Sequence, residues 1–124
     1  MTALYRGASP AWARSAAGPT DLVQATGTKG DVTAYLFGYP LRSGHPEDPA
    51  NKILWVVRQP RDGSELTISG HLLGASAPAV SQQQPPDSSP GEIYPSIVDV
   101  PMPGCWEFTL QWHGHEDSVD LPYQ

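Results

Sequence analysis

The feature that most constrains the fold is a run of alternating side chains, C-W-E-F-T-L-Q-W-H, over residues 105–113. Its large apolar side chains share one parity: Trp106, Phe108, Leu110 and Trp112. Successive side chains of a β-strand point to opposite faces, so this run predicts a strand with one buried face. Each buried aromatic ring removes about 150–250 Å² from water, and we therefore expect this strand to dominate the core.

The residues on either side of this strand predict how the chain enters and leaves it. We predict a strand over 98–100, followed by a Pro/Gly corner at 101–104 where the chain crosses between sheets, because proline cannot donate to a ladder. Trp106 lies just after the corner and is expected to pin the crossing, as tyrosine does in a tyrosine corner. The segment His113-Gly114-His115 predicts a tight turn, and alternation resumes up to Tyr123 in a final strand.

The rest of the chain predicts an all-β fold. Fourteen prolines and twelve glycines interrupt any long helix, and apolar runs of strand length occur at 22–26, 32–37, 52–58 and 66–72. The run at 32–37 is apolar on both parities, so we expect it to be covered on both sides. We predict an immunoglobulin-like antiparallel β-sandwich of about seven to eight strands over residues 21–124, preceded by an extended N-terminal arm at 1–20.

Charge and cysteine content restrict the classes of function. The 124 residues carry a formal net charge of −6, which disfavours binding to nucleic acid because phosphates repel an acidic surface. No apolar run approaches the roughly 20 residues of a transmembrane helix. Cys105 is the only cysteine, so an intrachain disulfide is impossible.

Three runs together carry a resemblance to a known family: N-K-I-L-W-V-V-R-Q-P-R-D-G-S at 51–64, D-S-S-P-G-E-I-Y-P-S-I-V-D-V-P at 87–101 and P-G-C-W-E-F-T-L-Q-W at 103–112. Over residues 35–123 the chain resembles a family of small exported proteins and lipoproteins of actinobacteria. The resemblance implies a β-sandwich and an extracytoplasmic location, membrane-anchored or secreted in the full-length form, and it brings no catalytic residues. The printed residues contain no signal peptide, and here the chain departs from the family pattern.

Two proline- and glycine-rich segments, 38–51 and 74–91, predict long loops, and long loops in compact domains are often functional. Within the second of them, 79–83 has the composition of a short edge strand. We expect a non-enzymatic binding or structural module of the cell envelope that presents these loops to a protein or glycan ligand. The residues predicted to contact this partner are Tyr39, His45 and Tyr94. The alternative is that the aromatic side chains pack beneath the loops.

The second functional prediction is a transition-metal site at the last hairpin tip. His113, His115 and Glu116 supply the nitrogen and oxygen ligands that zinc or copper accepts. Asp117 is an alternative ligand, and His45 or His71 would complete the set from another segment. The competing interpretation is a solvated polar turn, and the leading function needs no cofactor.

Enzyme signatures are weak, so we predict that the protein is not an enzyme. Cys105 adjoins a core tryptophan, where cysteine usually acts as a small hydrophobic residue rather than as a nucleophile. The segment 74–78, G-A-S-A-P, lacks the last glycine of a nucleophile elbow. The carboxylate pairs 47–48 and 116–117 are adjacent in sequence, so on a strand they would point apart.

Overall fold

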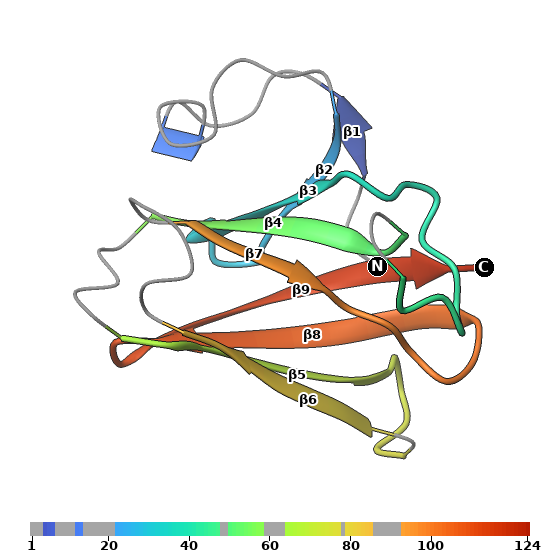
Figure 1. Cartoon of the computed structure of the whole chain (residues 1–124). Helices are drawn as coiled ribbons and strands as arrows, with labels where there is room; N and C mark the ends of the chain where they lie inside the picture. Colours follow the sequence, from blue (N-terminus) through green and yellow to red (C-terminus); the bar gives the residue numbers. More distant parts are fainter. Residues whose placement is uncertain are drawn as a thin grey trace.

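The computed structural model describes residues 4–6, 12–13, 22–47, 50–58, 64–77, 79–85 and 93–124. In this part of the chain, nine strands form two antiparallel sheets that pack face to face (Figure 1). The first sheet has the order β1-β2-β3-β4-β7, with β1 at Tyr5–Arg6, β2 at Val23–Thr26, β3 at Val32–Leu36, β4 at Lys52–Val57 and β7 at Ile93–Ile97. The second has the order β6-β5-β8-β9, with β5 at Leu66–Leu72, β6 at Ala79–Gln84, β8 at Gly104–Trp112 and β9 at His115–Tyr123.

The connections between the sheets follow the immunoglobulin pattern. The chain crosses from β4 to β5 in the other sheet, then β7 returns beside β4 and β8 returns beside β5. If β3, β4 and β7 are compared with strands A, B and E of an immunoglobulin domain, then β6, β5, β8 and β9 take the places of its strands C′, C, F and G. The predicted immunoglobulin-like sandwich is therefore confirmed. The described residues hold nine strands rather than seven or eight, because β1 and β2 extend the first sheet beyond the A position.

The alternating run becomes β8, and its large apolar side chains face the interior as predicted: Trp106, Phe108, Leu110 and Trp112 are buried. On the opposite sheet, β4 contributes Ile53, Trp55 and Val57 to the same core. The Trp55 and Phe108 rings pack edge to face with centroids 6.2 Å apart, and the centroid of Tyr123 lies 6.1 Å from that of Phe108. The contact between Trp55 and Phe108 joins the two sheets, and Tyr123 extends the aromatic cluster within the second sheet.

The first sheet is also covered on its outer side. All five residues of β3 are buried, which confirms the prediction made from its apolar side chains on both parities. A second apolar cluster lies on this outer side and consists of Ala13, Tyr35 and Val56, with Trp12 and Leu22 packed against them. Two of these residues belong to the segment 1–20, whose β1 strand pairs with β2. Most of that segment lies outside the described residues.

Trp106 pins the crossing into β8, as predicted. Its indole Nε1 donates a hydrogen bond to the backbone oxygen of Met102, four residues upstream, over 3.0 Å. The phenol of a tyrosine corner makes the same kind of bond. Gly104 allows the sharp entry, since its φ of 138° favours glycine and a Cβ there would lie 2.8 Å from Cδ2 of Leu72.

The strand predicted over 98–100 is wrong, because β7 ends before it. Its backbone groups bond with another connection rather than with a neighbouring strand. The Val98 amide donates to the oxygen of Asn51 over 3.1 Å, and the Gly44 amide donates to the oxygen of Val100 over 3.1 Å. This segment therefore becomes part of the support for the loop between β3 and β4.

The segment 74–91 is not one loop, because β6 occupies its middle and pairs with β5. The edge strand indicated by residues 79–83 is thus confirmed. The described residues before and after β6 lie at opposite ends of the sandwich (Figure 1). A ligand at the loop between β3 and β4 would therefore meet only the first part of the predicted second loop.

A buried carboxylate ties the sheets together at the far end. Asp117 on β9 is 1% exposed and accepts hydrogen bonds from the amides of Lys29 (2.8 Å), Asp31 (2.9 Å) and Ser118 (2.8 Å). Two of these amides belong to the turn between β2 and β3 in the opposite sheet. Gly27 leaves the space for the carboxylate, because a Cβ there would lie 2.2 Å from Oδ2 of Asp117.

We expect Asp117→Asn to lower the free energy of unfolding by about 1–3 kcal/mol, because the new amide group turns a donor toward amides that need an acceptor. Urea denaturation of the two proteins measures the difference. The control is Glu116→Gln, which makes the same chemical change at the adjacent exposed position and should leave stability within about 0.5 kcal/mol of the wild type. Equal stability of Asp117→Asn and the wild type would contradict this role.

Candidate functional site

The first candidate site is the loop that joins β3 to β4, at the end of the sandwich that carries the C-terminus (Figure 1). Its described residues surround an open hollow of about 500 Å³. Side chains that line this hollow include Phe37, Tyr39, Arg42, His45 and Glu47. The predicted contact residues Tyr39 and His45 thus share one surface, which we call the loop 37–51 surface.

Asn51 organises this loop from below. It is fully buried and has a φ of 58°, a conformation that asparagine tolerates better than most residues. Its Oδ1 accepts from the amide of Arg42 over 2.8 Å, and its Nδ2 donates to the backbone oxygens of Arg42 (2.6 Å) and His45 (3.0 Å). The same Nδ2 donates to Oδ1 of Asp99 over 3.0 Å. One side chain therefore ties Arg42 and His45 to the end of the loop and to Asp99.

Two distant segments complete the support. Oδ1 of Asp99 also accepts from the His45 amide over 3.0 Å. The Ser43 amide donates to the oxygen of Gln124, and the Gln124 amide donates to the oxygen of Leu41, each over 2.8 Å. Leu41 is 1% exposed and anchors the loop in the core. Core packing and hydrogen bonds thus hold this part of the loop in one conformation.

Tyr123 supports the same region from the core. Its hydroxyl donates to the backbone oxygen of Val98 over 2.7 Å. Burial raises the pKa of Tyr123 above its usual range, and the negative charge of Asp99 adds to the shift. The hydroxyl therefore remains a donor at neutral pH, and the segment beneath the loop stays in place.

Two aromatic rings stand exposed on the loop 37–51 surface. Phe37 is 48% exposed and Tyr39 is 46% exposed. The ammonium group of Lys52 lies 5.8 Å from the centroid of the Phe37 ring, within the range of a cation–π contact. Large apolar side chains gathered on a surface are informative, because such patches mark interaction sites.

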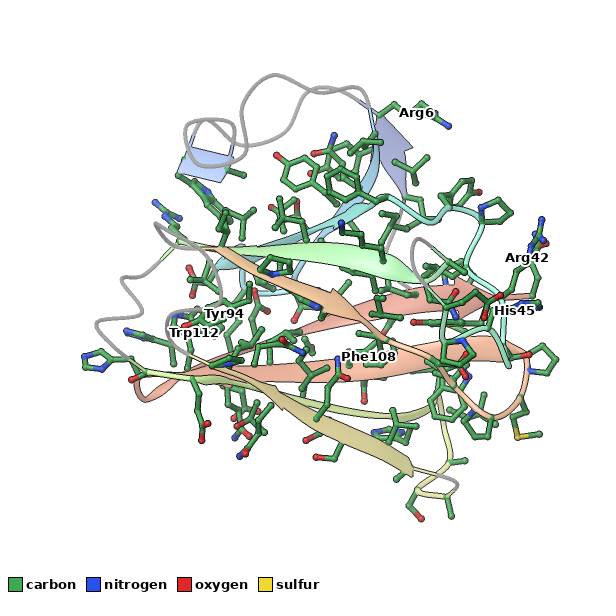
Figure 2. All side chains as sticks on the ribbon, viewed as in Figure 1. Arg6, Arg42, His45, Tyr94, Phe108 and Trp112 are labelled. Atoms are coloured by element: carbon green, nitrogen blue, oxygen red, sulfur yellow. The ribbon has the colours of Figure 1, made fainter. Side chains whose placement is uncertain are left out.

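The charged side chains of the surface differ in whether they have a bonding partner. Nδ1 of His45 lies 2.9 Å from Oε1 of Glu47, and this hydrogen bond lowers the pKa of the Glu47 carboxyl. Within the part of the chain that the structure describes, the Arg42 guanidinium has no ion pair or side-chain hydrogen bond. Figure 2 shows Arg42 and His45 at the outer rim of this end of the sandwich. Arg42 is thus available to a ligand.

The structure separates the third predicted contact residue from the other two. Tyr94 on β7 is fully buried, and its hydroxyl donates to the backbone oxygen of Ser64 over 2.8 Å. Figure 2 shows it near the end of the sandwich opposite His45. The alternative that aromatic side chains pack beneath the loops is correct for Tyr94, which serves the core rather than the loop 37–51 surface.

The second candidate site is the tip of the β8–β9 hairpin. His113 and Gly114 have φ values of 44° and 76°, as a two-residue hairpin turn requires. Oγ of Ser64 lies 3.3 Å from Nδ1 of His113. The ring centroids of His113 and His115 are 6.1 Å apart, and that of His115 is 5.8 Å from the Trp112 ring. The turn therefore brings the two imidazoles near one another.

The other proposed metal ligands do not join them. Glu116 follows His115 directly on β9, so its side chain points to the opposite face. Asp117 is occupied by the turn between β2 and β3, whereas His45 lies at the other end of the sandwich and His71 on β5 contacts Glu107. Among the described residues, no three His, Cys, Asp or Glu side chains are grouped to hold a metal. The metal site stays a prediction that rests on the two tip histidines.

Comparisons with models of protein families, with curated proteins and with solved structures found no match to this chain. The resemblance to exported actinobacterial proteins therefore stays an expectation. In the described part of the chain, no helix has the length and apolar character needed to cross a membrane.

The sequence did not single out Asn51, Asp99 or Arg42. Asn51 precedes a strand, and asparagine is common at such positions, so only its positive φ and its partners distinguish it. Asp99 stands between two apolar residues in a segment that the sequence predicted to be a strand.

We expect both Asn51→Gly and Asn51→Ala to destabilise the protein, because each removes the side chain that bonds Arg42, His45 and Asp99. Asn51→Ala should be the less stable of the two by about 1–2 kcal/mol, since alanine also strains the positive φ that glycine tolerates. Urea denaturation measures both effects. Equal stabilities of the two variants would show that the backbone there does not require a positive φ.

Proposed function

We propose that the protein is a non-enzymatic binding module of the cell envelope and that the loop 37–51 surface is its ligand site. The observation that carries the proposal is the exposure of Phe37 and Tyr39 beside a hollow lined by Arg42, whose guanidinium has no partner among the described residues. Its extracytoplasmic location follows from the resemblance alone. The hydrogen bonds of Asn51 and Asp99 support the proposal, because a loop already ordered loses little entropy when it binds.

The chemistry of the surface favours a glycan that carries carboxylate groups. Aromatic rings bind the flat apolar faces of sugars, and a guanidinium binds a carboxylate through two parallel hydrogen bonds. The hollow of about 500 Å³ falls within the range of about 300–1,000 Å³ typical of small-ligand sites. A concave site of this size suits one or a few sugar units better than the flat face of a globular protein.

We expect Phe37→Ala and Tyr39→Ala each to raise the Kd for an acidic oligosaccharide by about tenfold or more, which corresponds to about 1.4 kcal/mol. Arg42→Gln should weaken binding of the acidic oligosaccharide but not of its neutral analogue, because only the former offers a carboxylate. Titration calorimetry with oligosaccharides of uronic acids and of the matching neutral sugars measures these changes.

The matched control is Leu73→Ala, which removes an apolar side chain of similar exposure (46%) that does not line the hollow. It should bind like the wild type. An unchanged Kd in Phe37→Ala, Tyr39→Ala and Arg42→Gln would show that any glycan binds elsewhere, and failure of every acidic glycan to bind would contradict the proposed ligand class.

A second candidate function is binding of zinc or copper at the hairpin tip. It is supported by the distance of 6.1 Å between the ring centroids of His113 and His115. Imidazole suits both metals, and a site with two protein ligands would leave further positions to water or to another molecule. This function needs neither Glu116 nor Asp117.

For this second function, we expect zinc or copper to raise the melting temperature of the wild type and not that of the double variant His113→Ala/His115→Ala. A metal at a hundredfold excess over its Kd stabilises the folded state by about 2.7 kcal/mol. The control is His45→Ala/His71→Ala, which removes two histidines away from the tip and should keep the shift. Equal shifts in all three proteins would exclude the tip.

A further inference from the structure

The free edge of β6 differs from the other sheet edges in the described part of the chain. Figure 1 shows β6 as the outermost strand of its sheet, with β5 on one side only. Its sequence, A-V-S-Q-Q-Q, has no charged residue and no proline. Natural sheets usually protect their edges with charges, proline, bulges or very short strands, because an open row of amides and carbonyls recruits other strands. The β6 edge has no charged residue and no proline, and at six residues it is not a very short strand.

The other three edges carry such protection. β7 has Pro95 at its centre, and β1 is only two residues long. β9 carries Glu116 and Asp120 on its outer face, and the Thr28 amide donates to the oxygen of Ser118 from the neighbouring turn. The β6 edge is therefore the place where strand pairing meets the least resistance.

A hollow of about 300 Å³ runs along the inner side of β6. It is lined by side chains of β5 and β6 and by the segment after β7, among them Ile68, Val80, Gln82 and Asp99. The Nε2 group of Gln82 is buried and has no hydrogen-bond partner among the described residues. An unpaired buried donor costs about 1–3 kcal/mol, so a group that supplies an acceptor here would be favoured.

We propose that β6 pairs antiparallel with β6 of a second copy of this chain, about a two-fold axis at Gln82. In this register Gln82 faces Gln82 of the second copy. When each side chain turns from its buried position toward the edge, its carboxamide oxygen can accept from the Nε2 group of the other, which gives the buried donor a partner. A two-fold interface uses the same patch on both copies, and this patch is self-complementary because it is uncharged. Two chains of net charge −6 repel each other, so a neutral edge is where they can meet.

The register also determines which neighbouring residues face each other. In an antiparallel pair centred on Gln82, the residue before Gln82 in one copy lies opposite the residue after it in the other. Ser81 of each copy therefore faces Gln83 of the other. Both side chains lie on the exposed face of β6, so substitutions there leave the core unchanged. Like charges placed directly opposite each other destabilise such a pair, and opposite charges stabilise it.

Analytical ultracentrifugation of the full chain tests the proposal over about 1 μM to 1 mM, where weak association is detected. We expect the wild type to form dimers as the concentration rises. Ser81→Lys/Gln83→Lys should weaken dimerisation at least tenfold, and Ser81→Lys/Gln83→Glu should restore it, because lysine then faces glutamate across the interface. Circular dichroism confirms that each variant is folded.

The control is Gln111→Lys, which adds a lysine at an exposed position of β8, an inner strand, and should dimerise like the wild type. A wild type that stays monomeric up to the highest concentration would overturn the proposal. Persistence of the dimer in Ser81→Lys/Gln83→Lys would also overturn it. Failure of Ser81→Lys/Gln83→Glu to recover would refute the register and with it the proposed pairing.

Discussion

The buried aromatic side chains with polar atoms impose the constraint on which this structure depends. Trp55, Trp106 and Tyr123 fill the core, yet each must also find a partner for an N–H or O–H group that cannot reach water. Trp55 donates to Ser96 within the first sheet, whereas Trp106 donates to Met102 and Tyr123 to Val98 in the connection between β7 and β8. The same bonds that satisfy the core therefore position a connection outside the strands.

That connection supports the loop between β3 and β4, which carries the candidate ligand site. Once Tyr123 holds Val98, the adjacent Asp99 lies where it accepts from the loop between β3 and β4. Asn51 then bonds to Asp99 and to Arg42 and His45 of that loop. Hydrogen bonds and one step along the backbone, from Val98 to Asp99, thus connect the core to the loop 37–51 surface. A surface built in this way presents its exposed rings without first having to order the loop, and such preorganisation favours affinity.

The charge of the chain separates its two proposed interaction surfaces. The protein is acidic as a whole, and among the described residues the Arg42 guanidinium has no partner, so under our proposal it would select for a negatively charged ligand. The β6 edge is neutral, and in the proposed dimer it would pair with a second neutral edge. The exposed side chains of the two surfaces are different residues, whereas Asp99 lies beneath the loop and also lines the hollow beside β6.

The local alternation of apolar side chains determined the all-β class, the face of β8 that is buried, the corner at Trp106 and the two-sided burial of β3. These features depend on the spacing of neighbouring residues, which a strand converts directly into faces. Tertiary structure alone decided that Tyr94 is a core residue, that Asp117 bonds to a turn 88 residues earlier in the chain, and that Asn51 and Asp99 meet beneath a loop. The role of a polar or aromatic side chain depends on what lies opposite it. Strand order and register set that partner, and no local pattern encodes them.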